Sequence, residues 1–334
     1  MNGQRDWVIG VDLGATKIGM GLVDPQNRIV ARHRIATDPD ASPAATVAAV
    51  ADAVDHLRRA ASGTPSPAAL GICTPGPVDH VGGTLIDPPN LPGLHHAPLR
   101  DLLEAELGIP VRLEHDAKAA AVGEFHYGAG RGERSMVYIV VGTGVGAAII
   151  LDGQVYRGGH NSAGEIGHVT LDPEGETCSC GNQGCVETYL SGPWLARRYE
   201  ASLGSEGAAA DGAGLTGEAV SQRAAAGDPS ALSVMAGAGR ALGVAVATMA
   251  MVLDVELYVV GGSVAKAGEL LLAPAREMMP HCCYESVGCR VRIVGSELVD
   301  DGPILGCAWL AREALSGTRH TGVIEAVRPP RVQP

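Results

Sequence analysis

Two segments of this 334-residue chain share one pattern: a strand rich in β-branched residues, a glycine turn and a second strand. The first is WVIGVDLGATKIGMGLVD, at residues 7–24, and the second is MVYIVVGTGVGAAIILDGQVY, at residues 136–156. Glycine interrupts each run at the point where a hairpin would turn. Each hairpin opens one half of the chain, so the sequence predicts two related α/β lobes around a cleft.

Further elements follow each hairpin. Apolar residues at helical spacing predict helices over 41–61, 99–107 and 231–253. Short apolar runs predict strands at 68–74, 110–115, 254–261 and 290–298, with a helix over 117–128 directly after the second of them. We expect a surface loop at the Gly- and Ala-rich stretch 203–217 and disorder in the tail 316–334.

Composition limits the function. Apolar residues make up 46% of the chain and charged residues 19%, which is typical of a packed globular protein. The net charge of −12 argues against binding to nucleic acid or to an anionic membrane, because phosphates would be repelled. The N-terminus lacks the pattern of a signal peptide, and three of the eight cysteines crowd into one short segment. We therefore expect a cytoplasmic protein in a reducing compartment.

Three glycine turns stand at strand ends, in DLGATK, VGTGVG and VVGGSVAKAG. Backbone N–H groups in such turns can point at phosphate oxygens, and Asp12 is suited to hold Mg²⁺, through water. For the first turn taken alone, a tight hairpin is the simpler interpretation. Three such turns together indicate a nucleotide cleft, whose candidate residues are Asp12, Gly14, Thr16, Lys17, Gly142, Thr143, Gly144, Gly261, Gly262 and Ser263.

Asp116 lies where the strand PVRLEH meets the helix AKAAAVGE. Its position alone favours a helix N-cap, a place that aspartate fills well. A phosphoryl transferase, however, needs a carboxylate that accepts a hydroxyl proton, and a strand-to-helix junction facing a cleft is a suitable place for one. Both interpretations stay open at this point.

One imidazole and three thiols lie within eighteen residues, at His168, Cys178, Cys180 and Cys185. A closed Cys₃His set is typical of structural zinc, and the CxC spacing in a glycine-rich loop makes unliganded thiols the weaker interpretation. Glu165 and Glu187 flank the cluster. A zinc knuckle would hold both carboxylates rigid, which suits a ligand with many hydroxyl groups; without the metal they would be two exposed acids.

With these motifs the chain resembles the ROK family of sugar kinases, and within it the bacterial zinc-containing glucokinases. The resemblance covers residues 8–315 and is most specific in AGEIGH and CSCGNQGC. It implies an actin/hexokinase-like (ribonuclease H-like) fold with an interlobe cleft. The small lobe would comprise residues 1–115, rejoined by the C-terminal helix 302–315. The large lobe would comprise 116–301, with the zinc knuckle at 168–185.

The resemblance also implies a function and a site. It implies ATP-dependent phosphorylation of a hexose at the 6-hydroxyl, with Mg²⁺, a structural Zn²⁺, and a homodimeric or homotetrameric assembly. The catalytic base would be Asp116. His168 would bond the sugar through one ring nitrogen and zinc through the other. Sugar-binding residues would be Gly76, Asn90, His115, Asp116, Glu165, His168 and Glu187.

One departure from the family pattern concerns the sugar. The family has NDANAAA where this chain reads HDAKAAA, so His115 replaces an asparagine that contacts hydroxyls near C3 and C4. His115 would either make an equivalent bond to glucose or select a modified sugar such as kanosamine (3-amino-3-deoxyglucose). Polyphosphate is an alternative donor. A transcription regulator is the rival class, but the first strand begins near Trp7, which we expect to leave no room for a helix-turn-helix. A non-catalytic sugar sensor is a third possibility, which Asp116 and DLGATK disfavour.

Overall fold

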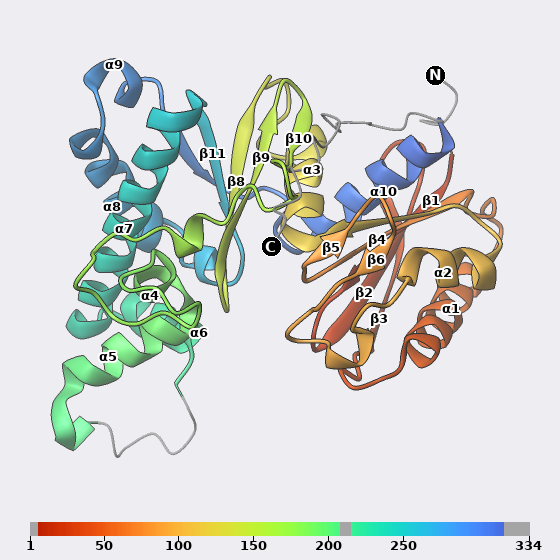
Figure 1. Cartoon of the computed structure of the whole chain (residues 1–334), viewed down its shortest axis with the longest axis horizontal. Coiled ribbons are helices and arrows are strands. Elements are labelled where there is room, and N and C mark those ends of the chain that lie inside the picture. Colours follow the sequence, from red (N-terminus) through yellow and green to blue (C-terminus); the bar gives the residue numbers. More distant parts are fainter. Residues whose placement is uncertain (1–5, 208–214, 317–334) are drawn as a thin grey trace, which may run out of the picture.

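The computed structural model describes residues 6–207 and 215–316 and shows two α/β lobes, each built on a five-stranded mixed sheet (Figure 1). The first sheet has the strand order β3-β2-β1-β4-β7 and the second has the order β10-β9-β8-β11-β12. The predicted two-lobed fold is therefore confirmed. In both sheets the hairpin strands are antiparallel and the strands that follow helices are parallel.

The first sheet is covered on both faces. Ile9, Val11 and Leu13 pack with α1 and α2 in one core cluster, and Val8 on the opposite face packs against α10. This alternation follows from the two-residue period of a strand. The elements of this lobe are β1 (Val8–Leu13), β2 (Lys17–Val23), β3 (Ile29–Ala36), α1 (Pro43–Ala60), β4 (Ala69–Thr74), β5 (Val78–Asp79), β6 (Thr84–Leu85), η2 (Pro92–Leu94), α2 (Leu99–Leu107) and β7 (Val111–His115).

The second sheet has its large core on one face, where Val137 and Ile139 pack against the long helix α7. The strands are β8 (Met136–Val141), β9 (Val145–Leu151), β10 (Gln154–Tyr156), β11 (Leu257–Gly261) and β12 (Arg292–Gly295). The helices are η3 (Ile166–His168), α4 (Glu187–Leu190), α5 (Gly192–Gly207), α6 (Gly217–Ala225), α7 (Pro229–Leu253), η4 (Val264–Ala267), α8 (Glu269–Met278), η5 (Met279–Cys282), α9 (Glu285–Gly288) and η6 (Val299–Asp301).

Two helices connect the lobes, α3 (Asp116–Tyr127) and α10 (Gly302–Leu315), and they pack against each other (Figure 1). Helix α10 lies directly on the first sheet: a β-carbon at Gly10 would be 2.0 Å from the carbonyl oxygen of Ile304. Helix α3 packs on the face of the second sheet opposite α7, where Ala120 and Ala121 meet Tyr138. The division of the lobes at residue 115 stays a prediction.

Three expectations need comment. The loop predicted from residue 203 is wrong at its start, because α5 continues to Gly207; residues 208–214 and the tail 317–334 lie outside the described residues. Asp116 is the first residue of α3, and its N-cap is His115. Helix α7 is long and apolar enough to span a membrane, but it packs in the core of the second lobe, where residues such as Leu242 and Val246 are fully buried.

Candidate functional site

The parallel strands bring the motifs to one edge of each sheet. In the first sheet β1, β4 and β7 end together, so that Asp12 pairs with Cys73 and Thr74 pairs with His115 in register. In the second sheet β8 and β11 end together at their glycine turns. Ligands of open α/β sheets bind at this carboxyl edge. The motifs, far apart in sequence, therefore face the same space between the lobes.

A cavity of about 290 Å³ occupies this space. It is lined by both sheets and by the two connecting helices. Of the predicted nucleotide residues it collects Asp12, Lys17, Gly262 and Ser263, and the candidate base Asp116 lines the same cavity. Sequence reasoning missed several other lining residues, among them Gly19, Arg34, Tyr138, Lys266, Asp300 and Pro303.

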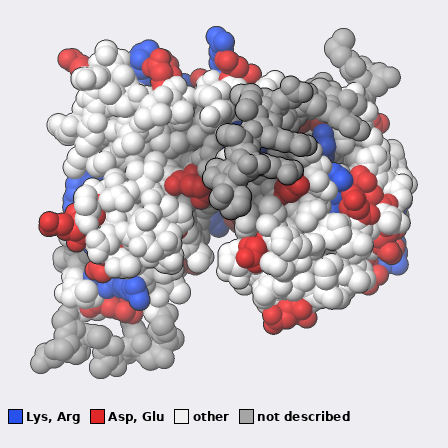
Figure 2. Space-filling model, viewed as in Figure 1, with Lys and Arg blue, Asp and Glu red and all other residues white. Residues whose placement is uncertain are grey.

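The charges in the cavity are mixed. Lys266 Nζ donates to Asp300 Oδ1 at 3.1 Å, whereas the Arg34 guanidinium has no hydrogen-bond or ion-pair partner among the described residues. Arg34 lies opposite Gly19 in the β2–β3 ladder, on the same face as Lys17. The side chains of Lys17 and Arg34 thus share the cavity with three carboxylates, those of Asp12, Asp116 and Asp300. On the outer face shown in Figure 2, acidic and basic side chains are interspersed.

Asp12 is held in an unfavourable environment for a charge. Burial, and after it the negative charge of Asp116, raise the pKa of Asp12 to about 6. The Cys73 thiol donates to its Oδ1 at 3.7 Å, and Lys17 also lowers the pKa, but neither offsets the burial. Carboxylate oxygens are the ligands that Mg²⁺ prefers, so the site fits a divalent cation that would compensate this charge.

We expect Asp12→Asn to stabilise the nucleotide-free, Mg²⁺-free protein. Because the folded-state pKa is raised from 3.8 to about 6, the stability that protonated Asp12 contributes is present below pH 3.8 and is lost as the pH rises through 6. At pH 8 the ionised group opposes folding by roughly 1–3 kcal/mol. The variant should therefore melt a few degrees above wild type at pH 8, with a smaller gap near pH 4. An equal gap at both pH values would contradict this.

Asp116 and His115 share one backbone donor at the start of α3. The Ala117 N–H donates to Asp116 Oδ1 at 2.6 Å and to His115 Nδ1 at 3.3 Å, and these two acceptor atoms lie 3.1 Å apart. The Asp116 side chain is 40% exposed and is open to the cavity. A β-carbon at Gly76 would come within 2.4 Å of the His115 ring, so the Gly76 turn packs directly on the imidazole.

The second and third glycine turns lie side by side. A β-carbon on Gly142 would be 3.4 Å from Ser263 Oγ, and one on Gly262, whose φ is +94°, would clash with the carbonyl oxygen of Val141. Thr143 and Gly144 are exposed at the tip of the β8–β9 hairpin. Gly261, which precedes the third turn, is the last residue of β11. The first turn closes by a 3.0 Å hydrogen bond from Gly14 N to Lys17 O. Its residues Gly14 and Thr16 adjoin the cavity residues Asp12 and Lys17 in the chain.

The four candidate zinc ligands come together. Their ligand atoms all lie within 4.8 Å of one another, with 3.7 Å between Cys180 Sγ and Cys185 Sγ and 3.7 Å between Cys178 Sγ and His168 Nδ1. Tetrahedral zinc with Zn–S bonds of about 2.3 Å requires S···S edges of about 3.8 Å. The cluster therefore fits a zinc ion held by His168 Nδ1 and three thiolates.

The remaining predicted sugar residues are distributed around the cluster. Glu187 accepts the Val145 N–H at 3.0 Å, which ties the cluster to the second glycine turn. Glu165 is exposed at the start of η3, three residues before His168. Asn90 is exposed in the turn between β6 and η2, and its side chain makes no hydrogen bond within the described part of the chain.

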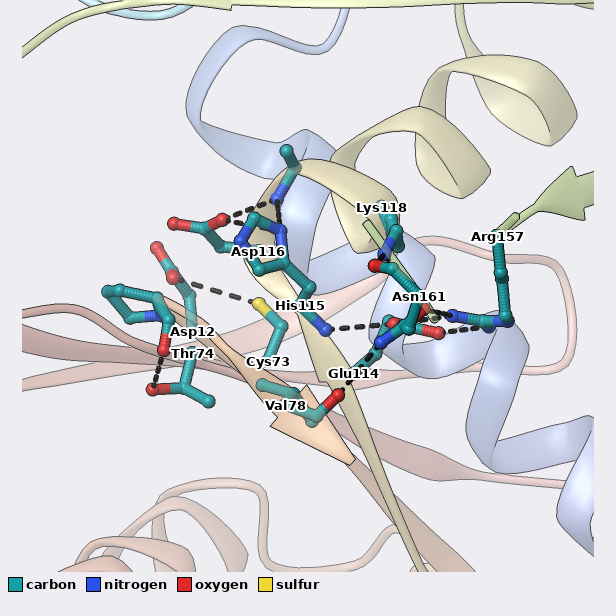
Figure 3. A network of polar contacts seen from close by, with 12 residues as sticks. Asp12, Cys73, Thr74, Val78, Glu114, His115, Asp116, Lys118, Arg157 and Asn161 are labelled. Carbon is teal, nitrogen blue, oxygen red and sulfur yellow. Dashed lines mark hydrogen bonds and ion pairs between the residues drawn. The ribbon is translucent and has the colours of Figure 1, made fainter. Parts of the chain in front are cut away.

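Beside His115 lies a buried polar network that the sequence analysis did not identify (Figure 3). Arg157 makes a two-point ion pair with Glu114, whose Oε1 also accepts the His115 N–H at 2.9 Å. Burial raises the pKa of Glu114, but the charge and the hydrogen bonds of the Arg157 guanidinium lower it by more, so that the pKa of Glu114 lies below its usual value. Lys118 and Asn161 complete the network.

Comparison with known proteins gives the class of the chain. It belongs to the ROK family, whose profile matches residues 8–314. This confirms the resemblance drawn from the motifs, and the two-lobed fold with its zinc-type cluster agrees with a ROK sugar kinase.

Individual relatives cover the whole fold. A glucokinase from Streptomyces coelicolor is 35% identical over 318 residues, covering 91% of this chain and 97% of the relative. An N-acetylmannosamine kinase from Citrobacter koseri is 33% identical over 304 residues, with 91% and 98% covered. The crystal structure of a ROK glucokinase from Streptomyces griseus, in complex with glucose and AMPPNP, is 36% identical with a TM-score of 0.76, with 92% and 99% covered. Relatives acting on different sugars are thus similarly close.

Proposed function

We propose that this protein transfers the γ-phosphoryl group of ATP to the 6-hydroxyl of a hexose, glucose in the first place. One observation carries the proposal: Asp116 lines the same cavity as Asp12, Lys17 and the third glycine turn, and its Oδ1 lies 3.1 Å from the ring of His115, on which the Gly76 turn packs. A carboxylate that borders a phosphate-type site is what phosphoryl transfer to an alcohol needs.

In this reaction the hexose O6 attacks the γ-phosphorus in line as the bond to the bridging oxygen of ADP breaks. Asp116 accepts the O6 proton. Lys17 and Arg34 lie where they would bind the phosphate chain, together with the backbone N–H groups of the three glycine turns (Gly14, Thr16, Gly142, Thr143, Gly144, Gly261, Gly262 and Ser263). Asp12 would hold Mg²⁺, which neutralises phosphate charge when bound.

On the sugar side, Glu165, Glu187 and His168 would orient the ring, with Gly76 and Asn90 at its border. His168 Nδ1 faces the thiols, which leaves Nε2 for the sugar. Zinc, when bound, would fix this imidazole and the flanking loop. Closure of the lobes would exclude water and so prevent hydrolysis of ATP.

His115 bears on the choice of sugar. Its Nδ1 lies 3.1 Å from Asp116 Oδ1 and 3.3 Å from the Ala117 nitrogen, contacts that are compatible with either tautomer, and its Nε2 lies beside the Gly76 turn. With the proton on Nε2 the ring would donate to a sugar hydroxyl, and with the proton on Nδ1 it would accept from the ammonium group of a 3-amino sugar. Glucose is the first candidate because relatives named glucokinases are similar over the whole fold, and kanosamine stays the alternative substrate.

The test is ADP release from ATP·Mg²⁺ with glucose, mannose, glucosamine, N-acetylmannosamine and kanosamine, repeated with polyphosphate as donor. We expect glucose to give the highest kcat/KM. Kanosamine turnover with little glucose turnover would make His115 a residue that selects the 3-amino group. No turnover with any sugar, together with tight sugar binding, would favour the regulator. We further propose a cytoplasmic homodimer or homotetramer, with no nucleic acid or membrane partner.

A further inference from the structure

The buried polar network beside His115 joins three of the segments that carry proposed sugar residues, those around Gly76, His115 and Glu165. Asn161 donates through Nδ2 to the Val78 carbonyl at 2.8 Å, just after the Gly76 turn. Lys118 Nζ, in the first turn of α3, donates to both the carbonyl and Oδ1 of Asn161 at 2.9 Å. Arg157 Nη1 donates to the same Oδ1 at 3.4 Å (Figure 3).

Asn161 itself lies in a loop that leads to Glu165. The loop closes on itself through a 3.1 Å hydrogen bond from Ala163 N to the Arg157 carbonyl, and Asn161 has a φ of +60°. Gly164 then bonds to β9, because its carbonyl accepts the Ala147 N–H at 2.7 Å. The orientation of Glu165 therefore depends on a loop whose inner face is held by the network.

The other end of the network reaches the candidate base. Glu114 precedes His115 and Asp116 in the chain, is 2% exposed, and binds both Arg157 and the His115 backbone N–H. Lys118, 5% exposed, is two residues after Asp116. Glu114, Lys118 and Asn161 thus lie within four residues of a group that the proposed function places on the sugar, and Arg157 connects to them through its bonds to Glu114 and Asn161.

Stability alone does not account for such a network. A buried ion pair is often no more stabilising than apolar residues of the same size, because both charges must be desolvated. What a fully bonded polar network supplies is a single geometry. Here that geometry connects β5, which pairs with β6 in a small two-stranded sheet, to β7 of the first sheet, to helix α3 and to the loop after β10 of the second sheet.

We propose that Lys118, Asn161, Arg157 and Glu114 are positioning residues that set hexose affinity by holding Gly76, His115 and Glu165 in one preassembled pocket. The inference rests on the proposed function, since it assigns the hexose to that pocket. The network acts through the residues it holds and takes no part in proton transfer.

The variant Asn161→Ala removes the side-chain amide that bonds to the Val78 carbonyl, to Lys118 and to Arg157. Its matched control is Asn27→Ala: Asn27 has a similar φ of +63° and accepts from Arg312 Nη1 at 2.6 Å, beside α10 and outside the cavity. We expect N161A to raise the KM and Kd for glucose at least about tenfold, with kcat and the KM for ATP within about threefold of wild type. The N27A substitution should lower the melting temperature about as much as N161A does, but it should leave the KM for glucose unchanged.

A double-mutant cycle makes the test specific. Lys118→Met keeps the buried stem and removes the donor; it should also raise the KM for glucose, and adding N161A to it should have little further effect. K118M alone provides the test if N161A does not fold. An active wild type whose N161A or K118M variant shifts the KM for glucose no more than N27A would refute this inference alone. A wild type that phosphorylates no hexose would refute the proposed function as well.

Discussion

Asp116→Asn is expected to lower kcat for hexose phosphorylation by about 10²- to 10⁴-fold while leaving the Kd for the hexose within a few-fold of wild type. An amide of the same shape still accepts the Ala117 N–H that now binds Asp116 Oδ1 at 2.6 Å, so the start of α3 should keep its geometry. It cannot accept the O6 proton. The loss should therefore fall on the chemical step.

The measurement is steady-state turnover together with calorimetric titration of glucose, in wild type and variant. The matched control is Asp101→Asn, which neutralises an aspartate in the first turn of α2, outside the proposed site, and should leave both quantities unchanged. A variant that keeps kcat within tenfold, or that loses hexose binding with kcat intact, would exclude Asp116 as the base.

Much of the architecture could be predicted because it depends on local patterns. The two hairpins, the helix over 231–253 and the strand before Asp116 all show a clear apolar period in the sequence. Asp116 at a strand-to-helix junction was equally visible. The error at residues 203–207 arose because the two glycines of LGSEG are typical of a loop, whereas α5 continues to Gly207. Low helix propensity is a weak predictor by itself, because the context of a segment can override it.

The missed site residues share a different cause. Arg34 reads as a solvent-facing residue of an alternating strand, and only the approach of α3 and α10 turns that face into a cavity wall. Glu114 and Arg157 are 43 residues apart, and no spacing rule relates them. In PVRLEH, Glu114 shares the polar face of an alternating strand with Arg112, so the sequence does not indicate that this carboxylate is buried and needs a partner. The identity of that partner depends on how the lobes pack.

The cysteine cluster leads to the second large effect. Cys180→Ser is expected to remove bound zinc, which should be near one ion per chain in wild type, and to weaken hexose binding strongly. The matched control is Cys282→Ser, because Cys282 is also an exposed free thiol but lies in η5, away from the cluster. Zinc content is measured by mass spectrometry and hexose affinity by titration, on the same preparations.

The size of the stability effect follows from linkage. Zinc that binds only the folded chain adds about 2.7 kcal/mol to the free energy of unfolding when its free concentration is a hundred times the Kd. C180S should therefore melt below wild type in zinc-containing buffer, and a chelator should lower the melting temperature of wild type more than that of C180S.

Function should suffer more than folding, for a geometric reason. The second lobe has a large core of its own, in which α7 packs on the sheet, and this core includes Val186 but none of the three cysteines of the cluster. Glu187 and His168, by contrast, are attached to the cluster itself, through contacts with Cys178. Loss of zinc should thus leave a folded protein whose sugar-binding groups are no longer fixed. A zinc-free C180S protein with unchanged glucose affinity would show that the cluster does not orient them.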